Sequence, residues 1–332
     1  MDWGLVGYGW VARDHMHPAL LAAGHKVAGI ADPSEEAQAA ARARGAIVYP
    51  DLDALLGRAR AIYVATPNHR HAEPVARALA AGIPVLCEKP MAADLSDAET
   101  IARAARSTGT LYGTAFDQRH HPAHRKLKAL IADGLIGRVA AVRIVYACWV
   151  GPDWTPPSAD GTGPNWRADP KSAGGGATID LALHGLDLAQ MLLGEELARL
   201  QILLQNRVHA YDVDDGGVLI GRFRSGALLQ AHVSYNCPEQ VPRRRLEILG
   251  EHGLLTATDT MGQSAGGRLM HHCGRSGVDR PIAFDGAASP FERQAVAFAD
   301  AVAGRPHDFS ATRDLKLMRL FDAAHREALA CR

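Results

Sequence analysis

Short apolar runs alternate with segments of helical character through the first third of the chain. The apolar runs have the length and composition typical of buried strands and cover residues 3–6, 26–31, 46–49, 61–65, 83–87 and 110–114. The segments between them carry residues typical of helix ends, such as Ser34 and Asp51 at helix starts and Gly109 at a helix end. Strands that alternate with helices in this way predict a parallel, doubly wound α/β sheet.

The pattern changes after residue 116, where strands begin to follow one another without helices between them. A helix over 122–132, a strand over 139–150, a loop over 151–176 and a helix over 177–193 come first. Strands are then expected over 200–209, 217–223, 227–235, 244–249, 254–258 and 268–272, and helices over 290–302 and 310–330. We therefore expect an N-terminal α/β domain over 1–117 and an α+β domain with a largely antiparallel sheet over 118–332.

Length and composition narrow the class of protein. A chain of 332 residues exceeds one ordinary hydrophobic core, in agreement with two domains. Lysine plus arginine equals aspartate plus glutamate at 36 each, so no electrostatic footprint for nucleic acid or an anionic membrane exists, and a small-molecule partner is favoured. The five cysteines are far apart without a Cys-x-x-Cys pair, which predicts neither a disulfide framework nor a thiolate metal site. With no signal-peptide pattern and no apolar run of membrane-spanning length, we expect a cytoplasmic protein.

A glycine-rich turn follows the first predicted strand. Gly7, Gly9 and Ala12 form Gly-x-Gly-x-x-Ala, in which the glycines allow a tight turn and the close approach of a pyrophosphate. Asp32 ends the second predicted strand, where a carboxylate can bind an adenosine ribose. No lysine or arginine follows Asp32 before Arg42 to meet a 2′-phosphate, so the sequence favours NAD over NADP. These features predict a dinucleotide-binding Rossmann fold for the first domain.

Polar side chains stand at the ends of two further strands. Glu88 and Lys89 follow one apolar run, and Thr66, Pro67 and Asn68 follow another. The carboxyl ends of parallel strands meet at one edge of the sheet, where open α/β sheets bind ligands. We expect these residues at the cofactor site, with a solvated Glu-Lys pair as the alternative.

Two groups of histidines invite a metal interpretation. His69 and His71 lie near a predicted strand end, and His120, His121 and His124 lie at the expected domain crossing. Neither group has a full set of ligands, and positions at helix starts account for both. We expect no metal.

An acid and an imidazole share one face of the helix predicted over 177–193. Asp180 and His184 are four residues apart, and apolar neighbours place them at the edge of a core, where pKa values shift. Such a pair suits acid–base chemistry, and an ordinary surface pair is the alternative. Asp187 is expected to orient or cap rather than to react.

The loop predicted over 151–176 is long for a compact domain, which is typical of functional loops. Trp154, Trp166 and Arg167 offer stacking planes and a guanidinium, suited to a sugar face or a cofactor ribose. Three glycines at 174–176 allow close backbone approach before the next helix.

Four segments, in this order, resemble motifs of the glucose-fructose oxidoreductase, inositol dehydrogenase and rhizopine-catabolism family, called Gfo/Idh/MocA. They are residues 7–12, 65–69, 81–90 and 174–184, and the Glu-Lys-Pro run followed by Asp-x-x-x-His is the most specific feature. The resemblance implies a Rossmann domain followed by a domain whose largely antiparallel sheet forms the substrate face and often an oligomer interface. It also implies reversible hydride transfer between a nicotinamide cofactor and a hydroxyl carbon of a sugar, cyclitol or related polyol.

The resemblance implies roles for residues that the pattern alone does not single out. Gln118 and Arg119 match a segment that contributes to the substrate pocket, although a surface ion pair accounts for Arg119 equally well. Trp166 and Arg167 match a pair beside the cofactor, and Tyr235 matches a substrate-contacting aromatic residue. A homodimer or homotetramer is expected.

Together these observations predict an NAD-dependent dehydrogenase of a sugar, cyclitol or glycoside. His184 is the expected base, poised by Asp180, and Lys89 polarises the reacting oxygen, unless Lys89 itself accepts the proton first. The predicted cofactor contacts are Gly7, Tyr8, Gly9, Trp10, Val11, Asp32, Thr66, Pro67, Asn68, His71, Glu88, Lys89, Trp166 and Arg167. The predicted substrate contacts are Lys89, Gln118, Arg119, Trp154, Asp180, His184 and Tyr235. Two alternatives are a glycoside hydrolase that oxidises its substrate transiently with a retained NAD, and an NAD-binding regulator without turnover.

Overall fold

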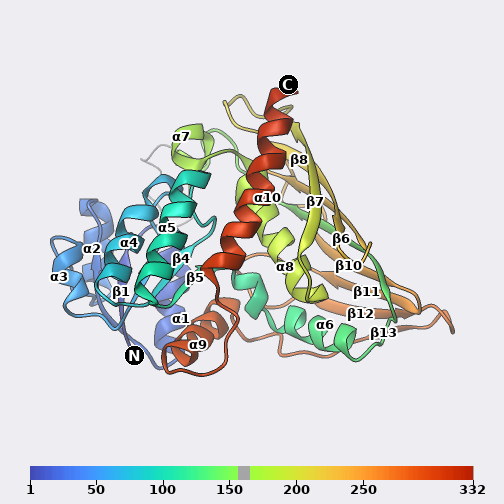
Figure 1. Cartoon of the computed structure of the whole chain (residues 1–332), viewed down its shortest axis with the longest axis horizontal. Coiled ribbons are helices and arrows are strands. Elements are labelled where there is room, and N and C mark those ends of the chain that lie inside the picture. The colour runs from blue at the N-terminus through green and yellow to red at the C-terminus, as the bar shows by residue number, and fades with distance from the viewer. Residues whose placement is uncertain (156–164, 332) are drawn as a thin grey trace.

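Two β-sheets, with helices between and around them, form the molecule (Figure 1). The computed structural model describes residues 1–155 and 165–331. The N-terminal third of the chain builds the first sheet, and the later strands build the second (Figure 1). Within the described chain, no helix combines the length and apolar character that crossing a bilayer requires.

The first sheet is parallel throughout and has the order β2-β1-β3-β4-β5. Its strands are β1 (Asp2–Val6), β2 (Lys26–Ala31), β3 (Ala61–Val64), β4 (Val85–Glu88) and β5 (Tyr112–Ala115). Separate apolar clusters pack on its two faces, and β3, β4 and β5 are buried along their whole length. The predicted doubly wound sheet is confirmed.

The strand predicted over 46–49 is wrong. Val48 makes only an isolated bridge to Ile30. The Ile30 N–H donates to the Ile47 carbonyl oxygen, and the Tyr49 N–H donates to the Ile30 carbonyl oxygen, each at 2.8 Å. Pro50 follows directly and cannot donate to a strand ladder, so the contact does not extend.

The helices of this part are η1 (Val11–Met16, π-helical), α1 (His17–Ala22), α2 (Glu35–Ala43), α3 (Leu52–Leu56), η2 (Asn68–Arg70, 3₁₀), α4 (Ala72–Ala80) and α5 (Leu95–Thr108). Their ends follow the predicted signals. Ser34 Oγ accepts a hydrogen bond from Ala37 N, and Asp51 Oδ1 accepts one from Ala54 N. Gly109 ends α5 at φ +67°, a conformation that glycine adopts without strain.

The second sheet has the order β13-β12-β11-β10-β6-β9-β8-β7. Its strands are β6 (Val139–Ala147), β7 (Leu197–Gln205), β8 (Gly216–Phe223), β9 (Leu228–Ser234), β10 (Arg244–Gly250), β11 (Gly253–Thr258), β12 (Arg268–Cys273) and β13 (Asp279–Pro281). Among the described strands of this second sheet, only β6 and β9 pair in parallel, which confirms the largely antiparallel prediction. The sequence missed β13 because its three residues are exposed and show no apolar alternation.

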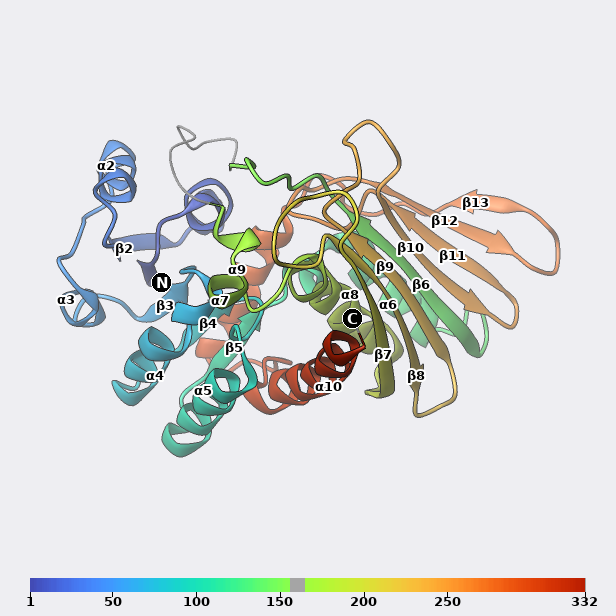
Figure 2. The same cartoon turned by 90° about the horizontal axis from the view of Figure 1, so that it is seen from above.

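Helices cover one face of the second sheet and leave the other bare (Figure 2). The covering helices are α6 (Pro122–Ala132), η5 (Thr178–Ala182, π-helical), α8 (Leu183–Leu193) and α10 (Ala311–Ala330). On the bare face, Leu203, Ile220 and Leu228 keep 76%, 52% and 55% of their surface exposed.

The last two helices return to the first sheet. Phe298 of α9 (Pro290–Val302) packs on Trp3 of β1, with 5.5 Å between ring centroids. α10 lies between α5 and β7 and therefore contacts elements of both sheets. The domain division after residue 117 stays a prediction. Both C-terminal helices contact elements on each side of that position.

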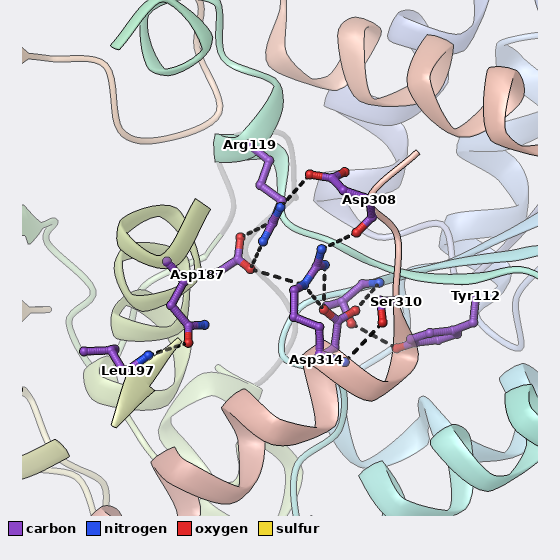
Figure 3. A network of polar contacts seen from close by, with 10 residues as sticks. Tyr112, Arg119, Asp187, Leu197, Asp308, Ser310 and Asp314 are labelled. Atoms are coloured by element: carbon purple, nitrogen blue, oxygen red, sulfur yellow. Dashed lines mark hydrogen bonds and ion pairs between the residues drawn. The ribbon is translucent and has the colours of Figure 1, made fainter. Parts of the chain in front are cut away.

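A buried ion network joins the domain crossing to the C-terminal helices (Figure 3). Arg119, from the 3₁₀ turn η3 (Asp117–His120), donates to both carboxylate oxygens of Asp187 on α8, at 2.6 and 2.9 Å. Its third nitrogen donates to Asp308, at 2.8 Å. Arg313 of α10 lies 3.9 Å from Asp187 and binds Asp314, which accepts the backbone N–H of a β5 residue. The network fixes the position of the crossing relative to α8 and α10.

We expect the Arg119→Met variant to lower the free energy of unfolding by about 3–5 kcal/mol, because it leaves the buried Asp187 carboxylate without its main partner. Urea denaturation followed by tryptophan fluorescence measures the change. Arg138→Met is the control, since Arg138 pairs with Glu251 at 3.8 Å on the surface and should cost less than about 1 kcal/mol. Equal, small losses in both variants would contradict the role of the network.

Candidate active site

The glycine-rich turn between β1 and η1 borders a concave cavity. Gly7 adopts φ +82°, and a Cβ there would lie 2.7 Å from the Ala65 carbonyl oxygen, so packing demands glycine. A Cβ on Gly9 would meet no protein atom within 4 Å. Packing inside the protein therefore does not require glycine at position 9, and the open space beside it fits the close approach of a dinucleotide's pyrophosphate.

Asp32 stands at the end of β2 and closes one end of this cavity, whose volume is about 380 Å³. Its two carboxylate oxygens accept the backbone N–H groups of Tyr8, at 2.6 Å, and Ser34, at 2.8 Å. The acid thus holds the glycine-rich turn and also faces the cavity. Arg70, which the sequence argument did not consider, lines the same cavity from η2.

Most of the predicted cofactor contacts line this cavity, namely Gly7, Gly9, Trp10, Val11, Asp32, Thr66, Pro67, Asn68, Glu88, Lys89, Trp166 and Arg167. Asn68 also donates to the Ala173 carbonyl oxygen at 2.8 Å and so connects the first sheet to the loop before η5.

Two predicted cofactor contacts do not line the cavity. The Tyr8 ring is buried in the core, where its hydroxyl lies 2.6 Å from His17 Nδ1, because side chains on this short turn alternate between core and cavity. His71 is buried between the carbonyl oxygens of Thr66 and Pro90, each 3.0 Å from a ring nitrogen. Burial lowers the pKa of His71 to about 4, so the neutral ring serves to hold the two strand-end loops.

A second cavity of about 220 Å³ adjoins the first. Lys89, Asp180 and Arg167 line both cavities, whereas Asp117 and His184 line only the second among the described residues. Lys89 and Asp180 therefore stand where a molecule in one cavity would meet a molecule in the other.

Asp180 is the centre of the contacts at this junction. Its Oδ1 pairs with Lys89 Nζ, which also donates to the Asp180 carbonyl oxygen at 3.1 Å, and its Oδ2 accepts the Tyr235 hydroxyl at 2.6 Å. Burial alone would raise the pKa of Asp180, but the charges of Lys89 and Arg167 and the two hydrogen bonds hold that pKa well below its usual range. Asp180 is therefore an anion that fixes the Lys89 ammonium.

Tyr235 was predicted to contact substrate, and the structure places its side chain away from both cavities. Its side chain is 1% exposed, lines neither cavity and gives its hydroxyl to Asp180. It supports the Lys89–Asp180 pair from behind.

Asp180 was predicted to poise His184, but the structure gives the two side chains different partners. Asp180 lies in the π-helical turn η5, and α-helical geometry resumes only at Leu183, so the four-residue spacing does not stack the two side chains. His184 Nδ1 instead lies 3.2 Å from Asp117 Oδ1, which is an ion-pair distance, although the contact does not meet hydrogen-bond geometry. Burial favours a neutral Asp117, but contacts with His184, Lys89 and Gln118 outweigh it and lower the pKa of Asp117.

Sequence reasoning missed Asp117, although a signal was present. Asp117 comes two residues after β5, a parallel strand, just as Lys89 follows β4. The strand-end argument that singled out Lys89 applies equally to Asp117.

Gln118 and Arg119 were predicted to contact substrate, and neither lines the cavity. The Gln118 amide donates to Asp117 Oδ2 at 2.8 Å and to the Gly262 carbonyl oxygen at 2.9 Å. The Arg119 guanidinium makes its hydrogen bonds within the buried ion network, to Asp187 and Asp308. The ion-pair interpretation of Arg119 was the better one, with the difference that the pair is buried.

The long loop contributes an aromatic clamp. The Arg167 guanidinium lies over the rings of Trp154 and Trp166, at 5.0 and 4.6 Å from their centroids, from the 3₁₀ turn η4 (Trp166–Ala168). Trp154 lines the second cavity and Trp166 the first. Residues 156–164 of the predicted loop lie outside the described residues.

The three glycines after the short helix α7 (Pro170–Ala173) allow the close approach that was predicted. A Cβ on Gly174 would lie 2.2 Å from the Ala93 carbonyl oxygen, and one on Gly176 would lie 1.9 Å from that of Asp214. The Asp214 carboxylate in turn accepts the N–H groups of Gly176 and Thr178, at 2.9 and 2.8 Å. These contacts fix the start of η5 and hence Asp180.

No group of three or more histidine, cysteine, aspartate or glutamate side chains is arranged to hold a metal ion within residues 1–155 and 165–331. His124, one of the candidates, bonds to the Gln118 carbonyl oxygen and the Thr260 hydroxyl, at 2.8 and 3.0 Å.

Glu88 is buried beneath Lys89, where its carboxylate accepts the Tyr63 hydroxyl and, at 3.2 Å, the Lys89 backbone N–H. Burial raises the pKa of Glu88 from 4.5 to about 7, against the opposing charge of Lys89. A carboxyl whose pKa is raised by folding stabilises the protein fully below its unfolded pKa and loses that contribution as pH rises through the folded value.

We therefore expect the wild-type protein to lose about 3 kcal/mol of stability between pH 4.5 and pH 7.5 that the Glu88→Gln variant does not lose. Urea unfolding across this pH range measures the difference. Glu99→Gln, which removes a surface carboxylate paired with Arg319, should follow the wild-type curve. Parallel curves for wild type and Glu88→Gln would show that Glu88 titrates normally.

Comparison with known proteins agrees with this geometry. Residues 1–116 match the model of an oxidoreductase family with an NAD-binding Rossmann fold, and residues 124–256 match that of the GFO/IDH/MocA C-terminal domain. The chain is 30% identical over 307 residues to 1,5-anhydro-D-fructose reductase of Ensifer adhaerens, a match that covers 91% of this chain and 88% of the relative. It is 32% identical over 308 residues to dTDP-3,4-didehydro-2,6-dideoxy-alpha-D-glucose 3-reductase of Streptomyces violaceoruber, covering 90% and 84%.

A solved structure of GenD2 from gentamicin A biosynthesis, in complex with NAD, superposes with a TM-score of 0.80 at 26% identity. The superposition covers 100% of this chain and 95% of that one. The chain thus belongs to the Gfo/Idh/MocA family of oxidoreductases, with an NAD-binding Rossmann fold.

Proposed function

We propose that the protein is an NAD-dependent dehydrogenase that oxidises a secondary hydroxyl of a sugar, cyclitol or glycoside of about one ring. The observation that carries the proposal is the Lys89–Asp180 pair at the junction of the two cavities, with His184 in the second cavity. The second cavity, at about 220 Å³, is smaller than the roughly 300–1,000 Å³ typical of small-molecule sites, which favours a single ring. Both named relatives are reductases of sugar derivatives.

Oxidation of a secondary alcohol breaks an O–H and a C–H bond, so the site must take up a proton and a hydride. NAD supplies the hydride acceptor when it occupies the first cavity. The proton goes to a base, and histidine is the side chain whose charge ordinarily changes nearest neutrality. We assign this role to His184, because its Nδ1 faces Asp117 and the ring lines the substrate cavity.

Lys89 stabilises the negative charge that develops on the substrate oxygen as the proton leaves. Asp180 and Tyr235 hold its ammonium at the junction. Asp117 orients the imidazole and stabilises its protonated form, the part that was first assigned to Asp180. In an alternative mechanism, Lys89 accepts the proton first and passes it to His184. The two mechanisms use the same residues, so only kinetic measurements distinguish them.

We expect Lys89→Met and His184→Gln each to lower kcat by about two orders of magnitude or more, while NAD affinity changes little, because each removes a group that acts on the reacting oxygen. NADH absorbance with a panel of polyols, aldoses and glycosides measures turnover, and fluorescence titration measures NAD binding. Asp117→Asn should cost less than the loss of His184, since the base remains. Lys126→Met, on the exposed face of α6, is the control.

Nearly unchanged turnover in His184→Gln, with the protein folded and NAD bound, would remove the proposed base. Release of aglycone from glycosides without net NADH would favour the hydrolase that retains its cofactor. NAD binding without turnover on any member of the panel would favour a regulator.

Asp32 supports NAD as the cofactor because its carboxylate would repel a 2′-phosphate. We expect NAD to bind clearly more tightly than NADP, and Asp32→Ser to narrow the gap by about tenfold, which corresponds to about 1.4 kcal/mol. Arg70→Gln should lower NADP affinity more than NAD affinity, since Arg70 is a cation in the same cavity. Equal binding of both cofactors by the unmodified protein would overturn the assignment.

We also propose a homo-oligomer formed through the bare face of the second sheet, as either a dimer or a tetramer. Leu203, Ile220 and Leu228 are exposed apolar side chains there, and Ile220 and Leu228 line a hollow of about 500 Å³. Light scattering at micromolar concentration should give at least twice the mass of 35.4 kDa. Leu228→Glu should shift the species toward monomer, whereas Leu21→Glu, equally exposed at 55% on α1, should not. A stable wild-type monomer would contradict the proposal.

A cytoplasmic location stays a prediction.

A further inference from the structure

Two cations that line the second cavity, Arg167 and Arg244, form no ion pair with a described carboxylate, and of these only Arg244 is absent from the first cavity. Its acids each have a partner within the protein: Asp180 has Lys89, Asp117 has His184, Glu88 has Tyr63, and Glu239 has Arg243 at 3.4 Å. Arg244 also lines the cavity and forms no ion pair with any described residue, and its Nε is buried without an acceptor among them. Resting on the function proposed above, we infer that the substrate carries an anionic group, a carboxylate or a phosphate, and that Arg244 binds it.

Arg244 is held by its surroundings. It is the first residue of β10 and pairs with Tyr146 of β6, and its guanidinium carbon lies 5.8 Å from the centroid of the Tyr146 ring. On another side Gly262 approaches so closely that a Cβ there would lie 2.5 Å from Arg244 Nη1. The Gly262 carbonyl accepts the Gln118 amide, so the turn against the guanidinium is fixed as well. A fixed, unneutralised guanidinium is suited to two parallel hydrogen bonds from an oxyanion.

The anion belongs to the substrate and not to the cofactor. Arg244 does not line the first cavity, whereas Arg167, the other cation at this site without an ion pair to a described residue, lines both cavities. The Tyr146 ring that contacts Arg244 also meets the His184 ring edge-on, with 5.9 Å between centroids. The anionic group would therefore sit about one aromatic ring away from the hydroxyl that His184 deprotonates. A sugar or cyclitol of one ring, with a carboxylate or phosphate on a carbon remote from the oxidised one, meets this spacing.

Binding to the NADH-loaded protein tests the inference without turnover. Calorimetry compares two matched pairs, methyl glucoside with methyl glucuronide and glucose with glucose 6-phosphate. We expect at least one acidic member to bind about tenfold or more tightly than its neutral partner, and the pair that responds distinguishes carboxylate from phosphate. The preference should weaken with added salt, because it depends on charge.

Two substitutions locate the preference. Arg244→Met, which keeps length and removes charge, should bring the acidic and neutral members within about threefold, while Arg244→Lys should retain part of the gap. Arg245→Met is the matched control, because Arg245 is the next residue of β10, is exposed and pairs with Glu247 instead of lining the cavity. It should leave the preference intact.

Wild-type protein that binds both neutral sugars as tightly as their acidic partners would overturn the inference, whatever the variants do. If Arg244→Met lowers the affinity for acidic and neutral sugars equally, the inference is also overturned, because an equal loss of affinity indicates a structural role for Arg244. NADH formation from the same sugars tests the proposed function separately. NADH formation from neutral sugars, without tighter binding of the acidic sugars, would contradict only the inference. Tighter binding of an acidic sugar, without any NADH formation, would contradict only the proposed function.

Discussion

The ion pair between Lys89 and Asp180 is the contact on which the rest of the site depends. Its two members come from different parts of the fold, Lys89 from the end of a parallel strand and Asp180 from a π-helical turn that packs on the second sheet. A pair taken out of water loses hydration that its mutual attraction alone does not restore. The Tyr235 hydroxyl and the Asp180 carbonyl oxygen provide the remaining hydrogen bonds, so the pair is stable only when both domains are in place.

The backbone around Asp180 explains why the glycines precede it. Gly174 and Gly176 lie against the carbonyl oxygens of Ala93 and Asp214, at distances that no side chain would permit. This lets the Asp214 carboxylate cap the start of η5 through two backbone N–H groups. The π-helical turn that follows directs Asp180 toward Lys89 and leaves His184, at the start of regular α-helix, facing Asp117. One irregular turn thus gives the acid and the imidazole separate partners.

Sequence reasoning succeeded where local pattern determines structure. Alternating apolar runs identified five parallel strands, and the strand-end rule placed Lys89, Thr66 and Asp32 at one cavity. It failed where a distant partner decides. The Arg119 side chain carries no mark of burial, and its partners Asp187 and Asp308 are 68 and 189 residues away. The pairing of Asp180 with His184 assumed regular α-helical spacing, and a π-helical turn has no signature in the pattern of apolar residues.

Three consecutive residues at the domain crossing link chemistry to stability. Asp117 contacts the imidazole of His184, Gln118 holds the turn at Gly262, and Arg119 binds Asp187 on the same helix as His184. Asp187 lies three residues after His184 on the same helix. The Arg119 guanidinium that holds α8 in place therefore also fixes the position of the His184 imidazole relative to Asp117. A short 3₁₀ turn in which successive side chains point in different directions makes this possible. The buried ion network therefore supports the candidate site, although none of its members lines the second cavity, and a change that loosens it should move His184 before it unfolds the protein.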